Sequence, residues 1–93
     1  MVLLTYTDPF FMDDLTAIRC KDDMINVVDA AAAEFFAATE TPETGENLAK
    51  VSDFIQSQIL NMEPGEKIEI GMITIIAVSD ERYKREYAER VNN

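Results

Sequence analysis

Apolar and polar residues alternate along residues 67–70 and give way to a mainly apolar run over 73–78, which predicts a β-hairpin within 66–78. Glycine suits the first central position of a type II′ turn, so we expect Gly71-Met72 to form a two-residue loop. That register places one apolar row on a single face, as a sheet packed against a core requires. The row consists of Ile68, Ile70, Ile73 and Ile75.

The opposite face of this hairpin is polar on the first strand but apolar on the second, where Ile76 and Val78 lie. Two explanations fit this asymmetry. The second strand can be central in a larger sheet, between 67–70 and 2–6, with a helix covering its far face. Alternatively, the far face can be a contact surface for another molecule. We adopt the first explanation as the prediction, because large apolar side chains are usually buried.

A long helix is predicted over residues 24–38, where apolar side chains recur at helical spacing. Asp22 or Asp23 is available as its N-cap, and acidic residues suit a helix N-terminus. The apolar stripe, followed by the three residues that widen it, consists of Met24, Val27, Val28, Ala31, Phe35 and Ala38, then Ile25, Ala32 and Phe36.

A second long helix is predicted over residues 45–62. Thr41 and Pro42 fit the N-cap and first helical positions, but Gly45 disfavours so early a start, so we expect the helix to begin near 45. Its stripe consists of Leu48, Val51, Ile55, Ile59 and Met62, with Phe54 and Leu60 on the flanks.

Three shorter elements complete the prediction. Residues 2–6 (VLLTY) read as a strand. Residues 15–20 alternate in polarity and form a candidate second strand, although a helix over 9–19 fits them as well. A C-terminal helix is expected over 80–91 with Ser79 as its cap. Its thin apolar stripe consists of Tyr83, Tyr87 and Val91.

These elements define an α+β fold with a small antiparallel sheet. The sheet is packed by two main helices, and a short C-terminal helix joins them. The strands come from the hairpin 66–78, with 2–6 and 15–20 as candidates, and the helices are 24–38, 45–62 and 80–91. A chain of 93 residues, 47% hydrophobic and 28% charged, has the composition of one globular domain, which we assign to residues 1–93.

The net charge of the chain limits the kinds of molecule that it can bind. It has 18 acidic and 8 basic residues, a net charge of −10. Residues 79–93 are neutral, so residues 1–78 carry the whole excess. Such a chain repels nucleic-acid phosphates and attracts basic protein surfaces, in a salt-sensitive manner. We therefore expect no direct nucleic-acid binding. Surplus acid also keeps a small protein soluble, which is the simpler explanation.

Most catalytic and cofactor sites are excluded by missing residues. The absence of histidine excludes Ser-His-Asp and Cys-His catalysis and histidine metal sites. Cys20 is the single cysteine, and without a histidine to activate it we expect it to be a buried small apolar residue. No glycine-rich phosphate loop is present. We expect no enzymatic activity and no cofactor. The carboxylates that could still form a metal site are Asp8, Asp13 and Asp14, or Asp22 and Asp23.

The cellular location is constrained by the apolar runs and by the single cysteine. No run approaches the ~20 residues that span a bilayer, and the start MVLLTYTDPFF lacks the basic region of a signal peptide. One cysteine fits a reducing compartment. We expect a cytoplasmic protein without membrane association, acting in the host cytoplasm if a phage encodes it.

Acidic residues crowd the first quarter of the chain and the connection between the long helices. Two phenylalanines within the first group fit a hot spot with a charged rim, although they can equally be core residues beneath a loop. If the two helices are antiparallel, residues 22–23 and 43–46 lie at opposite ends, so one continuous acidic surface does not follow. The candidate partner-binding residues are Asp8, Phe10, Phe11, Asp13, Asp14, Asp22, Asp23, Glu40, Glu43 and Glu46.

Two functions compete on these observations. The first is a small acidic inhibitor that occupies a basic surface of a protein partner, with carboxylates in place of nucleic-acid phosphates. In size, acidity and missing catalytic groups the chain resembles the phage or mobile-element inhibitors of restriction and CRISPR systems, some of which mimic DNA, and the resemblance is one of bulk properties without a shared motif. The second is a homo-oligomeric scaffold or small-ligand-binding protein with an apolar self-interface. The self-interface candidates are Phe54, Leu60, Ile76, Val78, Tyr83 and Tyr87.

Overall fold

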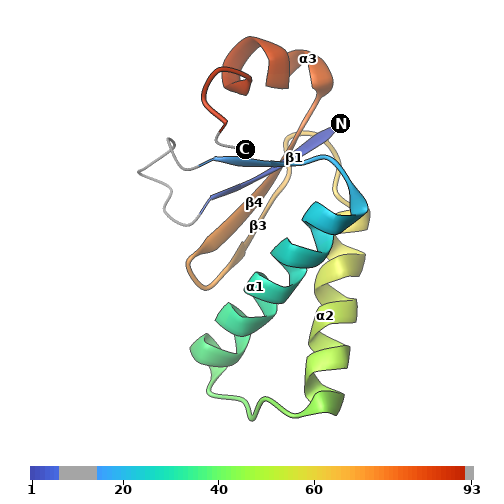
Figure 1. Cartoon of the computed structure of the whole chain (residues 1–93), viewed down its shortest axis with the longest axis vertical. Coiled ribbons are helices and arrows are strands. Elements are labelled where there is room, and N and C mark those ends of the chain that lie inside the picture. The colour runs from blue at the N-terminus through green and yellow to red at the C-terminus, as the bar shows by residue number, and fades with distance from the viewer. Residues whose placement is uncertain (7–14, 92–93) are drawn as a thin grey trace.

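The computed structural model describes residues 1–6 and 15–91, and it confirms the predicted α+β fold (Figure 1). One face of a four-stranded antiparallel sheet is covered by two long helices, and the other is completed by a short C-terminal helical segment. In chain order the elements are β1 (Val2–Tyr6), β2 (Thr16–Ile18), α1 (Lys21–Thr39), α2 (Gly45–Leu60), β3 (Lys67–Ile70), β4 (Ile73–Val78), α3 (Asp80–Arg82) and the π-helical turn η2 (Tyr83–Tyr87).

The sheet has the strand order β2-β1-β4-β3, and each neighbouring pair is antiparallel. The predicted hairpin and its register are confirmed, since Ile70 pairs with Ile73 and β3 continues from there along β4. Gly71 has a φ of 57° while Met72 does not adopt a positive φ, as a type II′ loop requires. Residues 16–18 form a strand, so the alternative helix over 9–19 is wrong for this part of the chain.

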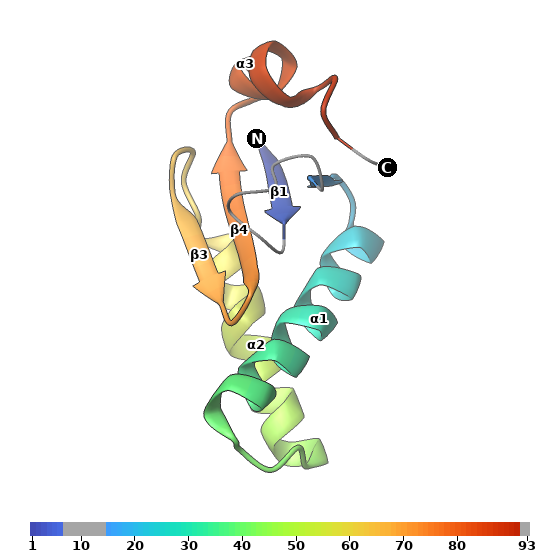
Figure 2. The ribbon, with the colours of Figure 1, turned by 90° about the vertical axis from the view of Figure 1, so that its left-hand side faces the viewer.

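The first face of the sheet packs against α1 and α2 (Figure 2). In α1 the buried side chains recur three or four positions apart, which keeps them on the side that meets the sheet and α2. The strands contribute alternate residues, because side chains of a strand point to opposite faces in turn. The buried residues of this core are Leu3, Ile18, Val28, Ala31, Ala32, Phe36, Ile55, Ile59, Met62, Ile73, Ile75 and Ala77.

The second face of the sheet has a core of its own. Val78 is fully buried and Ile76 is half-buried, so β4 is an inner strand packed on both sides, as predicted. Tyr87 of the C-terminal segment is only 6% exposed and belongs to this core, while Tyr83 packs against it. The other buried residues are Leu4, Tyr6, Leu15 and Ala17. The C-terminal segment is therefore part of the folded core.

The start of α1 differs from the prediction. The helix begins at Lys21 rather than near 24, and its N-cap is Cys20, which makes no side-chain cap hydrogen bond. Asp23 instead accepts a hydrogen bond from the backbone N–H of Arg19 at 3.2 Å. Cys20 is exposed, so its predicted burial is wrong. Ile25 is likewise 48% exposed, since it lies at the edge of the buried stripe.

The ends of α2 follow local capping chemistry. The helix begins at Gly45, and the N-cap is Thr44, whose hydroxyl accepts a hydrogen bond from the Asn47 N–H. Thr41 is therefore not the cap, and the later of the two predicted starts is the correct one. The helix ends at Leu60, two residues earlier than predicted, although Met62 just beyond it is buried.

The predicted helix over 80–91 is shorter and changes its winding. Ser79 caps it as expected, because its hydroxyl accepts a hydrogen bond from the Arg82 N–H. After the short α3, the Ala88 N–H donates to the Tyr83 carbonyl five residues earlier, which defines a π-helical turn. A hydrogen bond of 3.1 Å between the Arg82 guanidinium and the Tyr87 hydroxyl spans the same turn.

The antiparallel pair of α1 and α2 extends well beyond the sheet (Figures 1 and 2). The chain is elongated as a result, with extents of 41 × 24 × 21 Å. We call this helical pair, residues 21–60, the acidic arm, because its charge sets it apart from the rest of the chain.

Candidate functional site

The acidic arm concentrates the negative charge of the protein. It contains eight acidic residues and two basic ones, Lys21 and Lys50, so its net charge is −6 of the total −10. The acidic residues are Asp22, Asp23, Asp29, Glu34, Glu40, Glu43, Glu46 and Asp53. Within the described part of the chain, three of them are held by partners: Asp23 by the Arg19 N–H, Glu34 by the Met72 N–H and Glu46 by Lys50.

The five other carboxylates of the arm make no ion pair or hydrogen bond among residues 1–6 and 15–91. All five side chains are exposed, so their charges face solvent and are available to a partner. They are Asp22, Asp29, Glu40, Glu43 and Asp53. Charges that the fold itself does not neutralise are the ones that another molecule can pair with.

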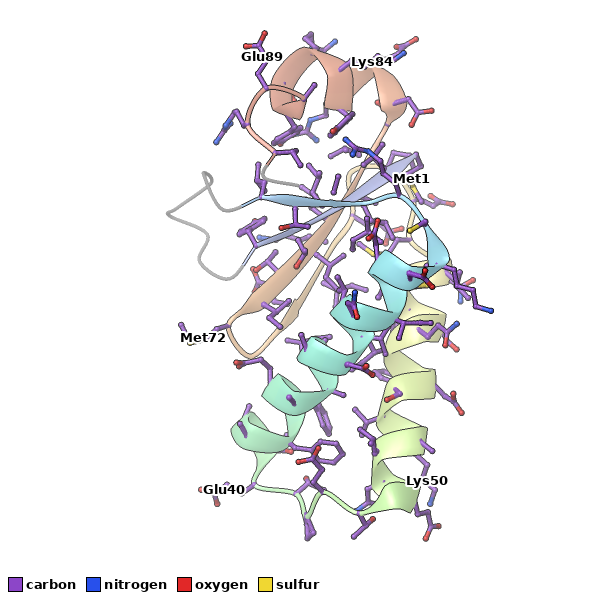
Figure 3. The ribbon with its side chains drawn as sticks, viewed as in Figure 1. Met1, Glu40, Lys50, Met72, Lys84 and Glu89 are labelled. Atoms are coloured by element: carbon purple, nitrogen blue, oxygen red, sulfur yellow. The ribbon has the colours of Figure 1, made fainter. Side chains whose placement is uncertain are left out.

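The predicted partner-binding residues do not form one cluster. Asp22 and Asp23 lie in the first turn of α1, whereas Glu40 is its C-cap and Glu43 precedes α2. Figure 3 shows Glu40 at the far end of the arm together with Lys50. A helix of 19 residues is about 28 Å long, so the two groups mark opposite ends of the arm. The remaining predictions, Asp8, Phe10, Phe11, Asp13 and Asp14, lie outside the described residues.

The linear charge density of the arm can be compared with that of a nucleic acid. Eight carboxylates along about 28 Å correspond to about one per 3.5 Å. Duplex DNA carries one charge per about 1.7 Å of axis, or per about 3.4 Å of each strand. The carboxylates of the arm thus have about the spacing of the phosphates in a single strand, and about half the linear charge density of a duplex.

A groove with exposed apolar walls runs beside the charged residues, where the sheet meets the helices. Its wider part, about 460 Å³, lies between Met1, the start of α1 and Leu60 near the end of α2. A narrower part of about 170 Å³ continues between α1 and α2, from Ile25 towards Asp29. The two parts share Lys21, Met24 and Gln56 as lining residues.

The structure divides the predicted self-interface residues into three groups. Phe54 and Leu60 are 63% and 64% exposed, and they lie about 120° apart around α2. Ile76 and Tyr83 are half-buried. Val78 and Tyr87 are buried in the second core, so their side chains are not exposed on the surface of this fold.

Two acidic residues of the C-terminal segment, Asp80 and Glu86, are held by basic partners. Arg82 Nε donates to Glu86 Oε2 at 2.6 Å, and this hydrogen bond lowers the pKa of Glu86 and raises that of Arg82. The amino group of Met1 lies 2.9 Å from Asp80 and lowers the pKa of that carboxyl through a hydrogen bond. The Arg19 guanidinium hydrogen-bonds the Tyr83 hydroxyl and lies 5.2 Å from the centre of its ring. These contacts join the segment to the start of the chain and of α1.

We expect Asp23→Ala to reduce the dependence of the unfolding free energy on pH in the acidic range. The Arg19 N–H lowers the pKa of Asp23, with a smaller contribution from Cys20. A carboxyl with a lowered pKa in the folded state stabilises the fold above its unfolded pKa, about 3.9, and the contribution disappears as the pH falls through the folded pKa. Urea unfolding should therefore show a lower midpoint for Asp23→Ala than for the wild type at pH 7, and the difference should close as the pH falls below about 3.9 and through the folded pKa.

The matched control is Asp22→Ala, in the same helical turn but without a hydrogen-bond partner among the described residues. Both variants remove a negative charge from the first turn of α1 and so change the interaction with the helix dipole. Only Asp23→Ala also removes a hydrogen bond. Equal midpoints for the two variants at pH 7 would show that the hydrogen bond between the Arg19 N–H and Asp23 does not stabilise the fold.

Comparisons with other proteins add no assignment. No protein-family model matches the chain, and neither a curated protein nor a solved structure matches it significantly. Among the described residues, no group of three or more His, Cys, Asp or Glu side chains is placed to hold a metal ion. No helix within residues 1–6 and 15–91 is long and apolar enough to cross a bilayer.

Sequence reasoning missed the groove. The walls of its wider part come from the start of β1, the segment from Ile18 into the first turn of α1, and the last turns of α2, which are far apart in the chain. The available signal was the pair of large apolar residues at the margins of the helical stripes, Ile25 and Leu60. Leu60 was noted as lying off its stripe, but only the fold shows that both residues border one groove.

Proposed function

We propose that this protein binds the basic surface of a protein partner through the acidic arm and thereby blocks that surface. The observation that carries the proposal is the set of five exposed carboxylates of the arm that no described residue neutralises. A nucleic-acid-binding protein is the kind of partner that offers such a surface. Inhibition of a restriction or CRISPR nuclease, as by phage anti-defence proteins, is one form of this function.

The charge spacing favours a particular form of mimicry. Because the arm carries about half the charge density of a duplex, it would replace one strand rather than both. The elongated shape supports this, since the arm reaches beyond the sheet and can enter a channel without the rest of the fold. The function is binding rather than catalysis, in line with the missing histidine.

The proposal is tested by capture from lysate followed by charge variants. Tagged protein is used as bait and washed at about 0.1 M and about 1 M salt, where the Debye length falls from about 10 to about 3 Å. A basic or nucleic-acid-handling protein that is retained at low salt and released at high salt is the expected result. Mass spectrometry identifies it, and purified partner is then titrated with the variants.

The decisive comparison uses two triple variants with the same net charge of −7. One replaces Asp22, Asp29 and Asp53 with asparagine, and the other replaces Glu63, Glu81 and Glu89 with glutamine. All six carboxylates lack partners among the described residues. If each arm contact contributes about 0.5–1 kcal/mol, the arm variant loses about ten- to hundredfold in affinity. Equal losses for the two variants would reduce the effect to bulk charge and refute the role of the arm.

A further inference from the structure

The groove beside the arm has the features of a docking site for a side chain of a partner. Of the exposed large apolar residues in the described part of the chain, three border it: Met1 (53%), Ile25 (48%) and Leu60 (64%). The half-buried Met24 lines both of its parts. Methionine side chains are flexible and polarisable, and they adapt to apolar groups of different shapes.

One carboxylate, Asp29, lines the groove, and helical spacing places Asp22 and Asp53 beside it. On α1, Asp22 and Asp29 lie three positions before and four after Ile25, so all three share one face. On α2, Asp53 lies seven positions before Leu60 and shares its face in the same way. The apolar floor is thus bordered on both helices by unpaired acidic residues.

The basic lining residues of the groove lie in its wider part and at the junction of the two parts. Lys21 lines both parts, and Arg19 lines the wider one, where its guanidinium is engaged with Tyr83. The other end, at Asp29 and Ser52, carries no basic lining residue among those described. The groove therefore has a polarity, with positive charge at the sheet and negative charge along the arm.

We infer that the groove binds one basic amphipathic helix of the partner, laid along α1 and α2 as a third helix. Its apolar residues, at positions i, i+3, i+4 and i+7, contact Met24, Ile25 and Leu60, and its lysines and arginines reach Asp22, Asp29 and Asp53. Its carboxyl end lies at Lys21, because the negative end of a helix dipole favours a basic neighbour. This inference rests on the proposed function, and it specifies which part of the partner binds to the acidic arm.

Two synthetic peptides of identical composition test the inference. The first has leucine and lysine at amphipathic helical spacing, and the second is a scramble that spreads the leucines around the helix. Binding is measured by calorimetry with the unmodified protein. Occupancy of the groove is measured separately from the rate at which a thiol reagent modifies Cys20, the single cysteine, which is exposed and lines the groove.

We expect the amphipathic peptide to bind about tenfold or more tightly than the scramble and to slow the modification of Cys20. Leu60→Ser should lower its affinity about tenfold. Phe54→Ser is the matched control, since Phe54 is equally exposed on the same helix but does not line the groove, and its affinity should stay within about twofold of the wild type. Circular dichroism confirms that both variants fold.

The other outcomes separate the two proposals. Equal, salt-sensitive binding of both peptides, without protection of Cys20, would overturn the groove inference and leave the acidic arm as a purely electrostatic binder. Failure of both peptides to bind would count against the arm as well. If sedimentation shows that the wild type is a dimer and Leu60→Ser a monomer, the groove is filled by a second copy, and the basic-helix inference is overturned.

Discussion

Replacing Val78 with aspartate is expected to unfold the chain. Val78 is fully buried in the second core, where β4 pairs with Val2 of β1. Within residues 1–6 and 15–91, no basic side chain is buried. An ionised carboxylate without a buried partner costs several kcal/mol, while a small domain is stable by only about 5–15 kcal/mol. Circular dichroism and thermal unfolding at pH 7 should show a chain without a cooperative transition.

The control for this variant is Phe54→Asp, which adds the same charge at a side chain that is 63% exposed. We expect its unfolding free energy to stay within about 0.5 kcal/mol of the wild-type value. The pair also tests whether the far face of β4 is a contact surface. If Val78→Asp remained a folded monomer with wild-type stability, the second face would be open, and the packing of the C-terminal segment described above would be incorrect.

Replacing Leu4 with alanine is expected to lower the free energy of unfolding by about 2–5 kcal/mol. Leu4 is fully buried in β1, between Ala17 of β2 and Ile76 of β4, and it faces the core that Tyr87 completes. The alanine removes apolar contacts and leaves a cavity that strands paired on both sides cannot readily close. Urea unfolding followed by circular dichroism measures the change.

Leu60→Ala serves as the reference for this measurement, because the same side chain is shortened at a position that is 64% exposed. Its expected effect is about 0.5 kcal/mol or less. A loss below about 1 kcal/mol for Leu4→Ala would mean that the second core is loosely packed. The C-terminal segment would then contribute little to stability, although the burial of Tyr87 leads us to expect a contribution.

The secondary structure was largely readable from local patterns. The hairpin and its register followed from alternation, and the loop followed from Gly71, because turn chemistry and side-chain period act over a few residues. The ends of the helices were less predictable. Asp22 and Asp23 are good capping residues by type, yet Cys20 occupies the N-cap of α1, because packing of the helix on the sheet decides where the chain turns.

The roles of individual apolar residues required the fold. Val78 and Ile76 were open to two explanations, since a continuous apolar run does not tell an inner strand from a contact surface. Tyr87 looked like part of a thin stripe on a surface helix. The position of β4 between β1 and β3, and the closure of its far face by the C-terminal segment, decide both cases.

The sequence by itself determined the α+β class, the two long helices, the hairpin and the net charge of −10, because these depend on composition and on residues close together in the chain. The tertiary structure alone decided where the charges lie relative to one another. It separates Asp22 from Glu43 by the length of α1, and it brings Met1, Ile25 and Leu60 to one groove beside unpaired carboxylates. The physical reason is that the distances between surface charges and the shape of a groove depend on how distant segments pack.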